Sequence, residues 1–143
     1  MDGLVRWLGE QLDVDEQVAR EATPGPWQNA PTNRHHATAS GRSEEAVFAS
    51  PPDTGATVVA ITGEAVERRH LVDAEHIARW DPARVLREID AKRQLLSRYE
   101  AMAADVLVAT GVEAILSEYR RVILPGLALP YADRPGYREE WRP

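Results

Sequence analysis

Three side chains at regular spacing are the first in this sequence that could do metal chemistry. His70, Asp73 and His76 form a His-x-x-Asp-x-x-His pattern within "HLVDAEHIAR". Imidazole and carboxylate groups bind zinc or iron, and steps of three residues place such groups along one drifting face of a helix. The two histidines are too far apart for the i, i+4 spacing that chelates one ion, and no second motif supplies a glutamate base. We therefore favour a solvated helix face, with a small metal-dependent or phosphate-handling enzyme as the alternative.

A second pair of histidines lies in the polar stretch "NAPTNRHHATASGRSEE". His35 and His36 could bind a metal or a phosphate, and they would extend the first group only if the fold brought the two together. The composition of the stretch is typical of an exposed loop, which is the interpretation we favour. No cofactor is expected.

Arginines gather around "RWDPAR" and are the candidates for binding a partner. Arg79, Arg84 and Arg87 could hold an acidic group through bidentate hydrogen bonds. The alternative is that the arginines of this region pair with acidic neighbours on the helix surface.

DNA binding is placed third among the functions. The net charge is −6, and "WDP" leaves almost no room for the turn of a helix-turn-helix motif. The sequence also lacks a Walker or Gly-x-Gly-x-x-Gly pattern and a nucleophile elbow. Enzymatic activity is therefore not the favoured expectation.

The composition predicts one cytoplasmic domain covering residues 1–143. Hydrophobic residues make up 43% of the chain, enough for one core, and the absence of cysteine excludes disulfides and thiolate metal sites. There is no apolar run of about 18 residues that would span a membrane. The acidic, amphipathic start is unlike a signal peptide.

An α+β fold is expected from the pattern of elements. Residues 2–22 read as a helix, and 23–63 as a loop and small antiparallel sheet. Within that sheet, "AVFAS" and "TVVAIT" predict a β-hairpin, and a third strand is expected at Trp27. In "ATPGPW", before this strand, Gly25 is suited to a positive φ.

Residues 71–124 are expected to be helical, with a short helix followed by longer ones. Asp81 is the predicted N-cap of the long helix, and Pro82 its first residue. Trp80 is expected to pack as a hydrophobic staple. Pro125 should end the helical part, leaving an irregular tail over 125–143 that is pinned by apolar residues, among them Leu129.

The long apolar stripe of the helical part predicts a homodimer, because one small sheet cannot cover it. The candidate residues of the seam between two copies are Leu95, Tyr99, Met102 and Val106.

Three motifs carry a resemblance to a known family: "ATPGPW", "HIARWDPARVLREIDAKRQLL" and "LALPYADRPGYREEWRP". The chain resembles a family of small actinobacterial and actinophage proteins catalogued as a domain of unknown function. More loosely, it is similar to Ead-like phage proteins. Relatives often carry Cys and His in the interval corresponding to 97–126, which would suggest a metal, whereas this chain has neither there.

The resemblance implies a phage or mobile-element context, an α+β fold and no known activity. Together with the residue patterns, it favours a non-enzymatic accessory protein that acts by binding another protein. The identity of that partner is not indicated.

Overall fold

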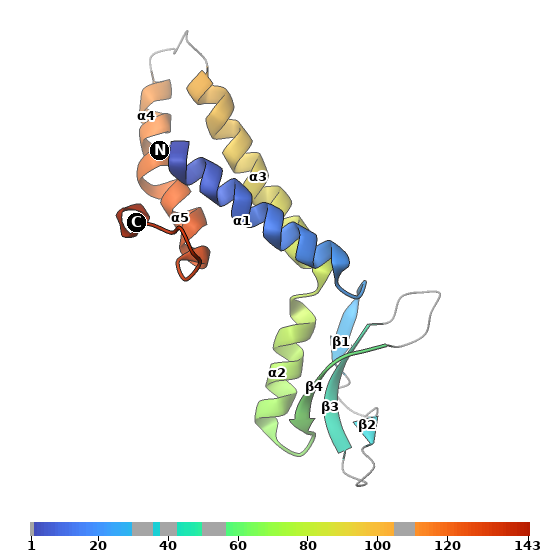
Figure 1. Ribbon diagram of the computed structural model, residues 1–143. Helices are drawn as coiled ribbons and strands as arrows, with labels where there is room; N and C mark the ends of the chain where they lie inside the picture. The colour runs from blue at the N-terminus through green and yellow to red at the C-terminus, as the bar shows by residue number, and fades with distance from the viewer. Residues whose placement is uncertain (1, 30–35, 38–42, 50–56, 105–110) are drawn as a thin grey trace. The chain divides into compact units, whose positions relative to one another are not determined.

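The computed structural model describes residues 2–29, 36–37, 43–49, 57–104 and 111–143 (Figure 1). The fold is α+β, as expected. The chain divides into two compact units, the first formed by Met1–Gln17 with Glu88–Pro143 and the second by Val18–Arg87. Helices α1 (Asp2–Glu21) and α3 (Pro82–Ala104) contribute residues to both units. Each unit is described by itself below.

The second unit contains an antiparallel sheet built around one central strand. The strands are β1 (Trp27–Asn29), β2 (His36–Ala37), β3 (Ser43–Ala49) and β4 (Thr57–Glu64). β3 pairs with β4 on one side, and with β1 and β2 on the other. The predicted hairpin and the strand at Trp27 are therefore confirmed. The turn predicted at "PPDTGA" lies outside the described residues.

Helix α2 (Arg68–Arg79) packs on this sheet, as Figure 1 shows. Small side chains face the strands, because Ala74 and Ala78 are buried against Val47 of β3. Partly buried side chains complete the cluster: Trp27, Val59, Ala60 and Ile77. The helix begins three residues before the predicted start. Its first turn is polar, so the spacing of apolar residues does not indicate where the helix begins.

Helix α3 begins as the sequence predicts. The Asp81 side chain accepts a hydrogen bond from the main-chain N–H of Arg84 at 2.8 Å. Its main-chain oxygen accepts the bond from the N–H of Val85 at 3.1 Å. Pro82, the first residue of the helix, has no N–H to leave unsatisfied. Asp81 is thus the N-cap of α3.

The first unit is helical. Beside α1 and α3 it contains α4 (Val112–Glu118), the π-helix η1 (Tyr119–Ile123), α5 (Leu124–Ala128) and the 3-10 turns η2 (Leu129–Tyr131) and η3 (Glu139–Trp141). Leucines of α1 are buried in the core of this unit, which comprises Leu4, Leu8, Leu12, Ile89, Leu96, Leu116 and Leu124. Gly111 has a φ of 107° and caps the start of α4, which therefore begins as a separate helix.

The prediction that Pro125 ends the helical part is wrong. Helical structure continues through Pro125 to Ala128. Just before the proline, the N–H of Leu124 bonds to the oxygen of Tyr119, five residues back, in a π turn. A proline cannot donate a hydrogen bond, and its ring crowds the carbonyl four residues earlier. The wider π turn accommodates both effects, so the helix passes the proline.

The remaining tail is pinned as predicted, although not by every residue named. Tyr131 is buried, and the Trp7 ring lies 5.7 Å from the ring of Tyr137 and 5.4 Å from that of Trp141, between centroids. Leu129, which was expected to help, is 44% exposed. Aromatic contacts to α1 therefore hold the tail.

Candidate functional site

His70 joins the end of β4 to the start of α2. Its Nδ1 lies 3.0 Å from the main-chain oxygen of Glu64, and because a carbonyl can only accept, Nδ1 carries the proton. The ring packs against Gly63, whose φ is 134° and where a Cβ would come within 2.5 Å of the ring. The main-chain oxygen of His70 also accepts a 2.8 Å hydrogen bond from the Thr62 hydroxyl. His70 thus makes several contacts within its own unit.

The other predicted metal ligands do not join His70 in a common site. Asp73 and His76 are exposed on α2, and the His76 ring is 6.3 Å from the ring of Trp80. His36 contributes its main chain to β2, and His35 lies outside the described residues. In the part of the chain that the structure describes, no three His, Cys, Asp or Glu side chains are grouped to hold a metal ion.

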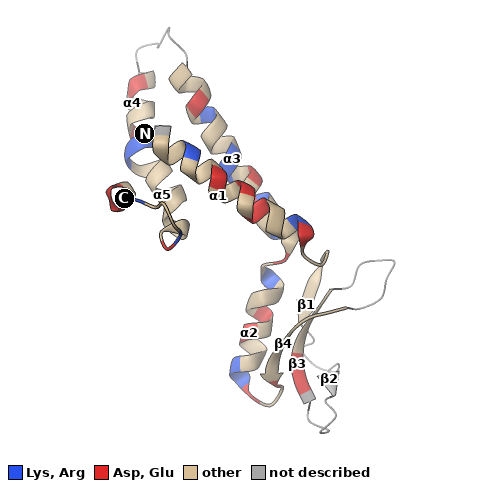
Figure 2. Cartoon of the chain, in the orientation of Figure 1, with Lys and Arg blue, Asp and Glu red and all other residues tan. Residues whose placement is uncertain are grey.

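The arginine candidates meet an exposed tryptophan where α2 gives way to α3. The guanidinium carbon of Arg84 lies 4.1 Å from the centroid of the Trp80 ring. Arg84 Nη1 also donates a hydrogen bond to the main-chain oxygen of Arg79 at 3.2 Å. Figure 2 shows basic residues near both ends of α2. We call His76, Arg79, Trp80 and Arg84 the Trp80 surface.

Trp80 was expected to be buried as a hydrophobic staple, but the residue is 42% exposed. α2 ends at Arg79 and α3 begins at Pro82, so Trp80 lies in a very short connection. The Trp80 ring is left partly exposed to solvent there. Arg84, in the first turn of α3, then stacks on it in a cation–π contact.

The three predicted partner-binding arginines have different surroundings. Arg79 pairs with Glu75 one turn earlier on α2, and Arg84 stacks on Trp80. Arg87 is exposed on α3. The structure therefore brings Arg79 and Arg84 into one surface, and among the described residues no hydrogen bond, ion pair or ring contact places Arg87 in it.

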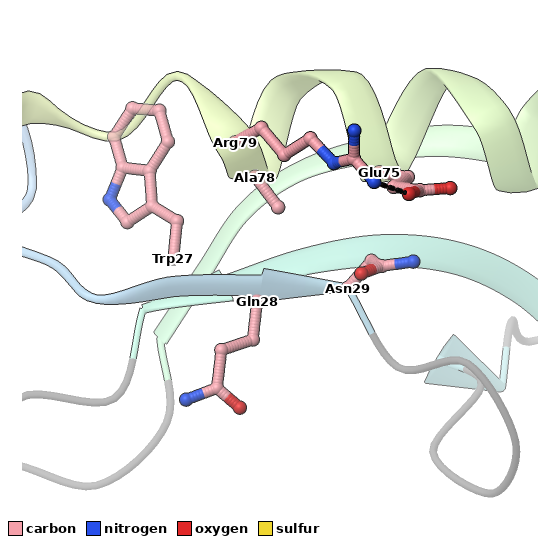
Figure 3. A pocket seen from close by; sticks show the side chains of 6 residues that line it. All are labelled: Trp27, Gln28, Asn29, Glu75, Ala78 and Arg79. Carbon is pink, nitrogen blue, oxygen red and sulfur yellow. Dashed lines mark hydrogen bonds and ion pairs between the residues drawn. The ribbon is translucent and has the colours of Figure 1, made fainter. Parts of the chain in front are cut away.

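A groove separates β1 from α2 in the same unit. Its volume is about 630 Å³, and its lining residues are Trp27, Gln28, Asn29, Glu75, Ala78 and Arg79 (Figure 3). Trp27 and Asn29 point toward α2, whereas Gln28 points away. The Trp27 ring is held by a 2.8 Å hydrogen bond from Nε1 to the main-chain oxygen of Thr23. Sequence reasoning missed this groove, because its two walls lie far apart in the chain.

The residues of the predicted dimer seam are distributed over a part of α3 in the first unit. Leu95 is 39% exposed and Met102 is half-buried, while Tyr99 is buried and stacks on Tyr119 with ring centroids 5.8 Å apart. Val106 lies outside the described residues. Tyr99 thus packs within its own unit.

Tyr99 also holds a charged neighbour in place. Its hydroxyl accepts a 3.2 Å hydrogen bond from Arg120 Nε. This bond, with a smaller contribution from Glu113, raises the pKa of Arg120 above its ordinary value. The arginine is therefore a fixed positive charge beside the stacked tyrosines.

Comparison with known proteins assigns the chain to a family whose function is unknown. The whole chain, residues 1–143, matches the model of a family of unknown function, DUF6221, and it belongs to that family. Searches of curated proteins and of solved structures found no match. Among the described helices, none has the length and apolar character needed to cross a membrane.

Proposed function

We propose that this protein is a non-enzymatic accessory protein that acts by binding another protein. The observation that carries the proposal is the exposed Trp80 ring with the Arg84 guanidinium stacked on it. Tryptophan and arginine are among the residue types most enriched at the positions that dominate binding energy in protein interfaces.

The geometry of the pair suits a binding role. Arg84 is held both by the Trp80 ring and by the main-chain oxygen of Arg79, so binding would immobilise little further rotamer freedom. A guanidinium can hold a carboxylate through two parallel hydrogen bonds. The ring beside it offers apolar surface that a partner can bury. We therefore infer that the partner presents an acidic side chain next to an apolar one.

The alternative functions have weaker support. A metal-dependent or phosphate-handling enzyme would use His70, Asp73 and His76, but His70 Nδ1 already bonds to Glu64 and its ring packs on Gly63. DNA binding ranks third because the net charge is −6. The proposed phage or mobile-element context rests on the three sequence motifs, and the proposed cytoplasmic location on the composition.

We also propose that the protein forms a homodimer through α3. Leu95 and Met102 supply the apolar surface for this seam, with Tyr99 behind them and Val106 as the fourth candidate. Light scattering on Leu95→Glu and on the unchanged protein tests it. An unchanged protein that runs as a monomer at all concentrations would rule the dimer out.

The binding proposal is tested by affinity capture from the native host, with and without phage infection. Trp80→Ala and Arg84→Ala should each retain at least tenfold less of the specific partner than the unchanged protein. Arg121→Ala is the control, because Arg121 is a helix-surface arginine, paired with Glu118, that lies in the first unit. Circular dichroism would confirm that all variants fold.

Retention of the same proteins by all variants would contradict a role for the Trp80 surface. A purified protein that turns over a phosphate ester, with loss of turnover in His70→Ala, would instead favour the enzymatic alternative.

A further inference from the structure

We propose that the groove beside β1 binds an extended segment of the partner, which adds to the sheet as a further strand. The inference rests on the proposed protein-binding function and specifies the form in which the partner is recognised. The occupant is a peptide segment with an apolar side chain and, toward the Trp80 surface, an acidic one.

The edge of the sheet selects an extended ligand. Among the described strands, β1 pairs only with β3 and so lies at an edge of the sheet. An edge strand presents main-chain N–H and C=O groups in the plane of the sheet, and an extended chain satisfies them in a regular ladder. A helix or a folded surface docking there would leave these groups without such a ladder.

The groove supplies specificity for alternate side chains. The side chains of Trp27 and Asn29 point toward α2, and that of Gln28 points away. Successive side chains of an added strand would alternate in the same way, so every second one enters the groove. Near Trp27 the wall is apolar, since the ring and Ala78 line it. Near Asn29 the wall is polar, with Glu75 of α2 beside it.

Charge at one end of the groove indicates the acidic residue. Arg79 lines the groove, and its main-chain oxygen accepts the hydrogen bond from Arg84. The groove is thus continuous with the Trp80 surface through Arg79. The Arg79 guanidinium is paired with Glu75, so an acidic side chain at this end of the bound segment would be held by Arg84, which favours that charge over a basic one.

Selection from a library of random twelve-residue peptides, displayed on ribosomes and applied to the full chain, tests the inference. The recovered peptides should share an apolar position and an acidic one. Their affinity should fall at least tenfold with Asn29→Trp, whose ring would fill the groove. Gln28→Trp is the matched control, because it places the same bulk on the same strand but on the opposite face. It should change the affinity less than twofold.

Backbone methylation of the recovered peptides gives a second test that leaves the protein unchanged. A strand that pairs with β1 uses alternate N–H groups, so N-methylation at every second position should weaken binding at least tenfold. Methylation at the intervening positions should have little effect.

The inference would be overturned by recovery of no binding peptide, by equal binding to Asn29→Trp and Gln28→Trp, or by methylation effects that do not alternate. If Asn29→Trp changed only the oligomeric state, the groove would be occupied by a second copy of this chain. That result would also overturn the inference. If host capture still depends on Trp80 and Arg84, the proposed function stands while strand addition fails.

Discussion

The indole Nε1 of Trp7 donates a 3.1 Å hydrogen bond to the main-chain oxygen of Pro135, 128 positions further along the chain. Close by, Arg134 Nη2 donates to the Asp15 carboxylate at 2.5 Å. An indole hydrogen bond and an arginine–carboxylate ion pair therefore join α1 to the C-terminal segment. The last residues of the chain are part of the packing of the first unit.

Gly136→Ala should destabilise the protein through this same contact. Gly136 has a φ of 85°, and a Cβ there would lie 2.9 Å from Trp7 Nε1. Backbone strain and the crowded indole should together lower the free energy of unfolding by about 1–3 kcal/mol. Gly126→Ala is the control, since a Cβ added to this residue of α5 would meet no atom within 4 Å, so alanine should stabilise by up to about 1 kcal/mol. Urea denaturation that shows equal effects would contradict this difference.

Two buried tyrosine hydroxyls should respond oppositely to removal. The Tyr131 hydroxyl accepts a 3.0 Å hydrogen bond from Lys92 Nζ, so Tyr131→Phe should cost about 1 kcal/mol of unfolding free energy. Within the described part of the chain, the buried hydroxyl of Tyr137 has no hydrogen-bond partner. Tyr137→Phe should therefore be neutral or slightly stabilising. Thermal unfolding of both variants measures the difference, and the reverse order would disprove it.

Gly25 and Asp81 should be energetically coupled, although they belong to different sequence motifs. A Cβ on Gly25 would lie 2.9 Å from Asp81 Oδ2, while Asp81 Oδ1 caps α3. Gly25→Ala should therefore displace the capping carboxylate, and Asp81→Ala should cost about 1 kcal/mol by removing it.

The double variant should cost less than the sum of the two single ones, because the cap can be lost only once. Urea denaturation of the four proteins in this cycle gives the coupling energy. Strict additivity would show that the two sites are independent.

Of the two described glycines in the second unit, Gly63 should be more damaging to replace with alanine than Gly25. The φ of 134° at Gly63 is unfavourable for alanine, and the added Cβ would overlap the His70 ring. We expect a loss of about 2–4 kcal/mol, because the ring must also leave its hydrogen bond to Glu64. Gly9→Ala in α1, where a Cβ has no neighbour within 4 Å, should be neutral or stabilising. Similar melting temperatures for the two variants would contradict the role of His70 described above.

Much of the secondary structure could be predicted from the sequence, because it depends on neighbouring residues. The Asp81 cap and the Pro82 start of α3 were correct, as were the hairpin and the strand at Trp27. The expected positive φ at Gly25 was wrong, since that residue is not among the glycines with positive φ. Its place beside Asp81 gives glycine a different use there, which is to leave space for the carboxylate.

The sequence by itself thus determined where most helices and strands form, since hydrophobic period, caps and turn residues act within a few positions of one another. Tertiary structure alone decided that His70 packs on Gly63, that Trp80 stays exposed, and that β1 and α2 enclose a groove. These features depend on which distant surfaces meet and on the volume of the side chains between them. The meeting of distant surfaces and the volume between them produce no periodic pattern in the sequence, so they could not be predicted from it.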